Sequence, residues 1–201
     1  MTTINDTNFH VAIDDWLNGS GSSYGDITTW DTSGVTNMSY AFRNMGSFNE
    51  DISGWNMSNV TSTNEMFSSA SAFNQPLNSW NMGNVTTTYK MFLNASAFNQ
   101  PLNSWNMEEV TTTESMFQNA TVFNQDINNW YTPKLKKTDK MFRNASSFNK
   151  NINNWYVANV TSMEYMFSNS TRGFASSFNQ PLNLWNMRNV KSTKNMFEGA
   201  S

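Results

Sequence analysis

The chain has 201 residues, no cysteine and a net charge of -3, and only 13% of its residues are charged. The lack of cysteine excludes disulfides and thiolate chemistry, and the weakly acidic charge argues against a nucleic-acid-binding protein. The sequence has no apolar run long enough to span a membrane and no amino-terminal signal-peptide pattern, so we expect no membrane insertion.

Residues 1–26 are predicted to form a helical cap and a turn. Apolar residues in this segment recur at the spacing of one helix face. They are Phe9, Ala12, Ile13, Trp16 and Leu17. Thr7 or Asn8 would begin this helix and Gly19 would end it. Because the ends of a repeat array need caps with a polar outer face, we expect the helix to cover the first repeat.

From residue 27 onward the sequence repeats with a period of 25 residues, lengthened once to 30. One tryptophan falls in each repeat, at Trp30, Trp55, Trp80, Trp105, Trp130, Trp155 and Trp185. A fixed period of this size is typical of a solenoid, in which each repeat is one coil stacked on the next. Residues 27–201 are therefore predicted to form seven coils, numbered here by their tryptophans, with all seven indole rings buried.

Each coil is predicted to hold one short parallel strand and one short helical turn. The strand is expected in the segment that Leu77, Trp80 and Met82 represent in coil three, because leucine-rich repeats place a strand at this spacing. The helical turn is expected in the return segment, where Thr111 with Glu114 matches a helix capping box. The fold class is thus an α/β repeat solenoid.

A second periodic feature is an asparagine that follows a phenylalanine in six of the seven repeats. The asparagines are Asn49, Asn74, Asn99, Asn124, Asn149 and Asn179. Stacked in register, their amides would bond turn backbone groups from coil to coil.

These repeats resemble those of a known family. W-N-M-S-N-V-T at Trp55 to Thr61 and M-F-x-x-A-x-x-F-N-Q at Met66 to Gln75 are similar to the repeat of BspA-like surface proteins, which are relatives of the leucine-rich repeats. The resemblance covers residues 27–201. It implies a right-handed, leucine-rich-repeat-like solenoid and a non-enzymatic role in surface recognition or adhesion, and it carries over no catalytic residue.

Residue types that support catalysis or metal binding are sparse. His10 is the single histidine, and without cysteine or a second histidine the usual zinc ligand sets are missing. Adjacent acids such as Glu108 and Glu109 are typical of a solvated surface, and nothing in the sequence indicates the burial that would raise the pKa of one of them. We therefore expect no enzyme, no cofactor and no metal site.

The positions that would face outward from the predicted sheet form an amide-rich surface. The residue after the tryptophan is Asn81 or Asn106 in coils three and four, and Tyr131 or Tyr156 in coils five and six. Amides and aromatic rings suit sugars and polar protein surfaces. The alternative is a solvated face whose asparagines serve solubility and stacking.

Two further irregularities lie beside these tyrosines. Coil five carries Lys134, Lys136 and Lys137 where other coils have polar residues, and an insertion before coil seven contains Arg172 and Phe174. Irregular stretches of a repeat array are frequent sites of specific contacts. We expect the tyrosines and lysines to form one exposed patch, although drift in a solvated repeat would also explain them.

Two functions remain open at this stage. The first is recognition of a protein or glycan through the asparagine- and tyrosine-rich face. The second is a structural role in a virion or fibre, in which coil seven contacts another subunit because no further repeat follows it. A two-fold or partner-protein contact fits better than a head-to-tail one, since the helix covers the opposite end. We expect a cell or virion surface, while the missing signal peptide leaves the export route and the cytosol open.

Overall fold

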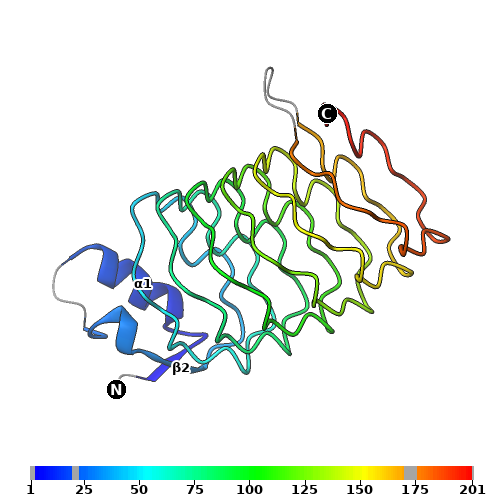
Figure 1. Cartoon of the computed structure of the whole chain (residues 1–201). Helices are drawn as coiled ribbons and strands as arrows, with labels where there is room; N and C mark the ends of the chain where they lie inside the picture. The colour runs from blue at the N-terminus through cyan, green and yellow to red at the C-terminus, as the bar shows by residue number, and fades with distance from the viewer. Residues whose placement is uncertain (1–2, 20–22, 170–175, 201) are drawn as a thin grey trace.

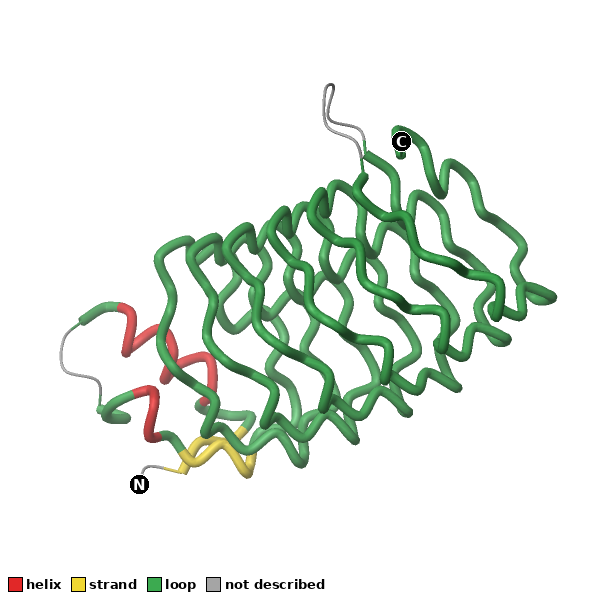
Figure 2. The backbone as a smooth tube through the Cα atoms, viewed as in Figure 1, coloured by secondary structure: helices red, strands yellow, loops and turns green. Residues whose placement is uncertain are grey.

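The computed structural model describes residues 3–19, 23–169 and 176–200. The chain forms one elongated array of stacked coils, with its two ends at opposite ends of the array (Figure 1). Helices and longer strands lie only at the amino-terminal end of the described chain: β1 (Thr3–Asn5), α1 (Phe9–Leu17), η1 (Ile27–Thr29) and β2 (Asp31–Gly34). The coils beyond them are turns and loops (Figure 2).

Helix α1 lies where the apolar periodicity predicts it and covers the first coils. Its buried side chains are Phe9, Ala12 and Ile13. The ring of Phe9 makes an edge contact with Trp55 at 5.7 Å between centroids, and Trp16 makes one with Phe48 at 6.1 Å. The helix therefore closes the amino-terminal end of the aromatic core.

The cap has a second part that the sequence did not predict. It is formed by β1 and Asp6, which extend the backbone pairing of the coils toward the amino terminus. Strand β1 pairs in parallel with β2. The carboxylate of Asp6 then accepts hydrogen bonds from the Thr36 backbone N–H at 2.8 Å and the Thr36 hydroxyl at 2.6 Å. In the next coil the Thr61 N–H bonds the Thr36 carbonyl, so Asp6 supplies the acceptor that a preceding coil would supply.

The tryptophan ladder is the main element of the core, and its predicted burial is confirmed. All seven side chains are buried, Trp185 most loosely at 8% exposure. From coil two onward each indole N–H donates to a carbonyl one coil back, as Trp105 does to Leu77 at 2.8 Å. Within the described chain the buried Trp30 indole N–H has no partner, because no coil precedes it.

The phenylalanines form two further ladders beside the tryptophans. Phe92 stacks on Phe67 and on Phe117 with centroids 5.5 Å apart in both cases. Within one coil Phe92 also stacks on Phe98 at 4.1 Å. Because each ring packs against rings above and below it, most of the core exists only when coils stack.

The predicted position of the strand is wrong. The segment from Leu77 to Val85 consists of two tight turns, in which the Trp80 N–H bonds the Leu77 carbonyl and the Val85 N–H bonds the Met82 carbonyl. Single parallel bridges lie instead in the return segment, where they join Asn37 with Ser62, Ser62 with Thr87, Thr87 with Thr112, Thr112 with Lys137, Lys137 with Ser162, and Ser162 with Ser192. Local turns engage the backbone N–H groups of Trp80 and Val85. In coils three and four β-branched threonines flank the bridging residue and favour the extended conformation.

The predicted helical turn is also wrong within the described coils. Lys90 and Asn94 adopt left-handed backbone angles, with φ of 53° and 59°, and such residues interrupt a right-handed helix. Their N–H groups point to the next coil, where Lys90 bonds the Glu114 carbonyl and Asn94 the Gln118 carbonyl. The Thr111 hydroxyl bonds the Thr86 carbonyl of the coil before it and caps no helix.

The predicted asparagine ladder is present. The side-chain oxygen of each asparagine accepts the backbone N–H of the next one, as Asn49 does from Asn74 and Asn74 from Asn99, both at 2.9 Å. The ladder continues through Asn124 and Asn149 to Asn179. These bonds fix one turn of every coil to the coil before it.

Candidate recognition surface

The two tyrosines and three lysines that the sequence singles out in coils five and six are all exposed in the structure. This Tyr–Lys patch comprises Tyr131, Tyr156, Lys134, Lys136 and Lys137. Tyr131 is 54% exposed and Tyr156 is 42% exposed. Their rings meet edge to face with centroids 6.2 Å apart, so the two tyrosines form one exposed aromatic pair.

In other coils the position of these tyrosines has a structural role. The side-chain oxygen of Asn81 accepts the backbone N–H of Gly83 at 3.0 Å, and that of Asn106 accepts the N–H of Glu108 at 2.9 Å. Asparagine favours such turns because its side chain mimics a backbone acceptor. The amide-rich face is thus explained by turn formation in coils three and four.

Coil five replaces this turn bond in two linked steps. The side chain of Tyr131 has no carbonyl oxygen to accept the N–H of the residue two positions on. That residue is Pro133, which has no N–H to donate. Acceptor and donor of the turn bond are thus lost together, and no N–H at this turn is left unpaired. Coil six changes only the first position, to Tyr156. Its second position is a buried Ala158, which still has a backbone N–H.

Lys134 occupies a row in which most coils have asparagine. Asn84 and Asn159 of that row donate their side-chain N–H to carbonyls of the preceding coil, those of Ser58 and Pro133. Coils four and five hold Glu109 and Lys134 in the same row, and the ammonium of Lys134 lies 2.7 and 2.5 Å from the two carboxylate oxygens of Glu109. An ion pair thus takes the place of the amide contact between these coils.

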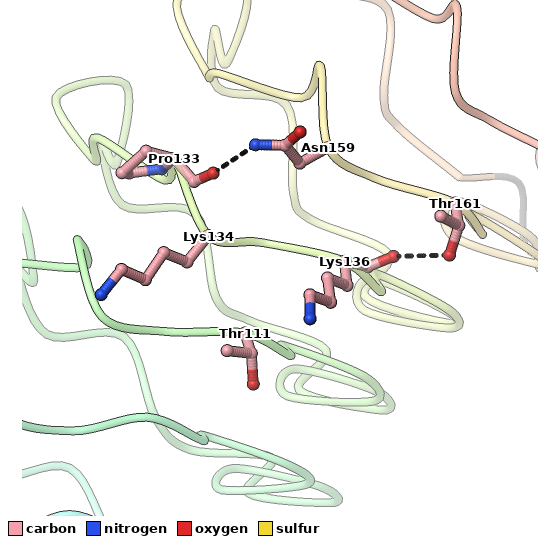
Figure 3. Close-up of a pocket in the computed structure, with 6 residues that line it drawn as sticks. All are labelled: Thr111, Pro133, Lys134, Lys136, Asn159 and Thr161. Atoms are coloured by element: carbon pink, nitrogen blue, oxygen red, sulfur yellow. Dashed lines mark hydrogen bonds between the residues drawn. The ribbon is translucent and has the colours of Figure 1, made fainter.

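A groove of about 370 Å³ spans coils four to six (Figure 3). Its lining residues are Thr111, Pro133, Lys134, Lys136, Asn159 and Thr161. Lys134 and Lys136 both extend toward the coil that carries Thr111. Asn159 and Thr161 bond the carbonyls of Pro133 and Lys136 at 2.7 and 3.2 Å, which fixes the far wall.

The charge of the groove is unbalanced. Ion pairs within the described residues join Arg43 and Lys90 to Glu65, and Lys134 to Glu109. Lys136 and Lys137 are exposed and belong to none of these pairs. A local positive charge therefore remains on a protein whose net charge is negative.

Other predicted features carry little chemistry in the structure. His10 contacts the ring of Phe9 at 5.2 Å, and the described residues contain no cluster of acids and histidines that could hold a metal ion. In the part of the chain that the structure describes, no helix is long and apolar enough to cross a membrane. Arg172 and Phe174 lie outside the described residues.

A second exposed region is the last described coil. Leu184, Met187 and Phe197 are 65%, 37% and 47% exposed. In coil six the N–H groups of Met163, Tyr165, Phe167 and Asn169 bond four carbonyls of coil seven. No described coil supplies such carbonyls to the equivalent N–H groups of coil seven.

Sequence reasoning missed the groove, the exchange of an amide row for an ion pair and the role of Asp6. The first two follow from how coils stack, yet aligning the repeats already shows Glu109 and Lys134 as neighbours in an asparagine row. Asp6 lies in the amino-terminal segment that the repeat does not cover, and its partner Thr36 is 30 positions away.

Comparisons with known proteins give one match. A family model described as "Mycoplasma protein of unknown function, DUF285" matches residues 7–130 and 101–201. The two matches together span the cap helix and all seven coils. No curated protein and no solved structure matches the chain.

Proposed function

Given that the chain belongs to the DUF285 family, we propose that it is a non-enzymatic recognition protein that binds a protein or glycan surface through the Tyr–Lys patch. We also propose that the coils are right-handed relatives of the leucine-rich repeats of BspA-like surface proteins, and that the protein acts at a cell or virion surface. The similarity of the repeat motifs supports this kinship.

The exposed aromatic pair is the observation that carries the proposal. Large apolar side chains on the described surface gather on the cap, on the patch and on coil seven, while Tyr40 and Val122 stand singly on coils one and four. At the patch two tyrosines stand in a row that elsewhere closes a turn with asparagine. Exposed tyrosines are enriched at recognition surfaces because each offers a broad ring and a polar hydroxyl at low entropic cost.

The test replaces the two tyrosines by the residue of the neighbouring coils. Tyr156→Asn can accept the Ala158 N–H as Asn81 accepts that of Gly83, and Tyr131→Asn leaves no donor unpaired because Pro133 has no N–H. Both tyrosine side chains are exposed, so the fold should persist. We expect this variant to lose retention on mammalian or bacterial cell surfaces and on glycan arrays to which the unaltered chain binds. Tyr40→Asn, at a tyrosine that is 51% exposed on coil one, serves as the matched control. Equal binding of all three proteins would contradict the proposal.

A structural role is the second candidate, supported by coil seven. Its exposed Leu184, Met187 and Phe197 and its row of N–H groups without a described acceptor form an uncovered edge, and such edges recruit other chains. The edge also offers carbonyls, such as that of Lys191, whose equivalent in coil six accepts the N–H of Lys191. It therefore suits a partner that supplies both donors and acceptors and an apolar surface. Analytical ultracentrifugation of the chain tests this role. We expect association that Leu184→Asn weakens, and a monomer at high concentration would contradict it.

A further inference from the structure

We infer that the ligand of the Tyr–Lys patch is an acidic oligosaccharide, one that carries carboxylate or sulfate groups. The inference rests on the proposed recognition function and adds the chemical class of the ligand. It places the sugar in the groove of coils four to six, with its anionic group near the ammonium group of Lys136, which lines the groove and precedes the exposed Lys137 in the chain.

The charge of the site selects an anion. Three lysines lie within four residues of coil five, and the carboxylate of Glu109 neutralises Lys134. Lys136 and Lys137 form none of the ion pairs among the described residues. An ammonium group without an ion-pair partner at a groove attracts a ligand of the opposite sign, even on a protein of net negative charge.

The neutral part of the groove suits a sugar. Hydroxyl and amide groups from coils four and six line it, those of Thr111, Asn159 and Thr161. Each hydroxyl oxygen that donates to a backbone carbonyl still has lone pairs to accept a sugar hydroxyl. The ring of Tyr131, two residues before the lining residue Pro133 and half exposed, offers an apolar face for the C–H groups of a sugar ring.

An acidic peptide fits the same surface less well. Peptides are recognised by adding a strand to a free sheet edge or by placing apolar side chains in pockets. Along this groove the backbone is already paired, since the N–H of Lys136 bonds Thr111 and that of Thr161 bonds Lys136. The lining residues include no large apolar side chain. At about 370 Å³ the groove lies in the lower part of the range for small-ligand sites, roughly 300–1,000 Å³.

The experiment compares two double variants on an array of defined oligosaccharides that includes neutral, uronate-bearing, sialylated and sulfated members. Lys136→Thr with Lys137→Ser introduces residues that neighbouring coils have at these positions. Lys191→Thr with Lys194→Asn removes the same charge from exposed lysines of coil seven. We expect the unaltered chain and the coil-seven variant to bind acidic members equally. The coil-five variant should bind them about 10-fold or more weakly, as loss of two favourable charge contacts implies.

Several outcomes would overturn the inference. Retention of neutral members alone would leave the recognition function in place but exclude an acidic ligand. Equal losses for both double variants, or equal binding of poly-L-glutamate, would reduce the effect to unspecific charge. If no member binds and the tyrosine variant also has no effect on cell surfaces, both the inference and the recognition function fail.

Discussion

The two ends of the array solve the same packing problem differently. At the amino-terminal end, α1 covers the aromatic core and Asp6 supplies a hydrogen-bond acceptor to coil one. At the other end, coil seven leaves Phe197 and Leu184 about half or more exposed. The comparison shows that a coil is complete only when both faces are covered, so the energetic value of a core residue should depend on its distance from the open end.

The largest effect is expected where a coil has neighbours on both sides. Trp105 stacks on Trp130 and its N–H bonds the Leu77 carbonyl. Trp105→Ala should lower the free energy of unfolding by about 3–5 kcal/mol, as for other large-to-small core changes. Thermal and denaturant unfolding measure it, and a change in melting temperature below about 2 °C would show that the ring is not part of a cooperative core.

The same change at the open end should cost less. Trp185 is buried to a smaller degree than Trp105, and no described coil packs on its outer face. We expect Trp185→Ala to lower the free energy of unfolding by about 1–3 kcal/mol, because folding buries less apolar surface around Trp185. Comparison of the two alanine variants under identical conditions decides the point, and equal losses would indicate that coil seven is covered in solution.

The capped end should show a smaller effect that depends on pH. Hydrogen bonds from Thr36, first from its hydroxyl and then from its backbone N–H, lower the pKa of Asp6 below its usual value. A carboxyl with a lowered folded-state pKa stabilises the fold above its unfolded pKa, and this stabilisation is lost as the pH falls through the folded pKa. Asp6→Ala should therefore cost about 1 kcal/mol at neutral pH, a value kept small because the carboxylate is exposed to solvent.

The pH profile is the sharper measurement for Asp6. The gap in stability between the unaltered chain and Asp6→Ala should be constant above about pH 4 and should close below it. Asp14→Ala, on an exposed residue of α1, is the control. A gap of the same size at pH 2 and pH 7 would mean that the charge of Asp6 has no role in the cap.

The smallest effect concerns the ion pair in the middle of the array. Lys134 and Glu109 are both well exposed, and such pairs contribute about 0–1 kcal/mol. Replacing both by asparagine, the residue of the same row in coils three and six, should leave the melting temperature within about 2 °C. A larger drop would show that the pair, rather than the stacked rings, holds these coils together.

The periodicity of the sequence correctly predicted those features that follow from stacking equivalent residues of successive coils. Trp80 and Trp105 recur at one position per coil, and stacking identical coils buries both, so their burial and the ladder through Asn74 could be read from spacing. The strand could not, because the spacing of Leu77, Trp80 and Met82 also suits two tight turns. The left-handed angles at Glu65 and Lys90 have no sequence signature either, since these residue types rarely adopt them without tertiary constraint.

The candidate site was predictable only in part. Tyr131 and Tyr156 stand out as breaks in a row, and their exposure follows from the same periodicity. The groove needs Thr111, Pro133 and Asn159 from three coils at once, which no single repeat encodes. The turn bonds of Asn81 and Asn106 explain why most of the amide face needs no ligand.

The indole hydrogen bonds have a consequence for how the chain acquires its structure. Each N–H of the ladder reaches a carbonyl that was synthesised earlier, as Trp155 does at Ile127 and Trp185 at Ile152. The asparagine ladder has the same direction. A coil leaving the ribosome thus finds these acceptors on the coil behind it, and α1, made before the coils, can seed the series. We expect folding during synthesis to advance from the amino terminus one coil at a time, as in other arrays with nearest-neighbour contacts.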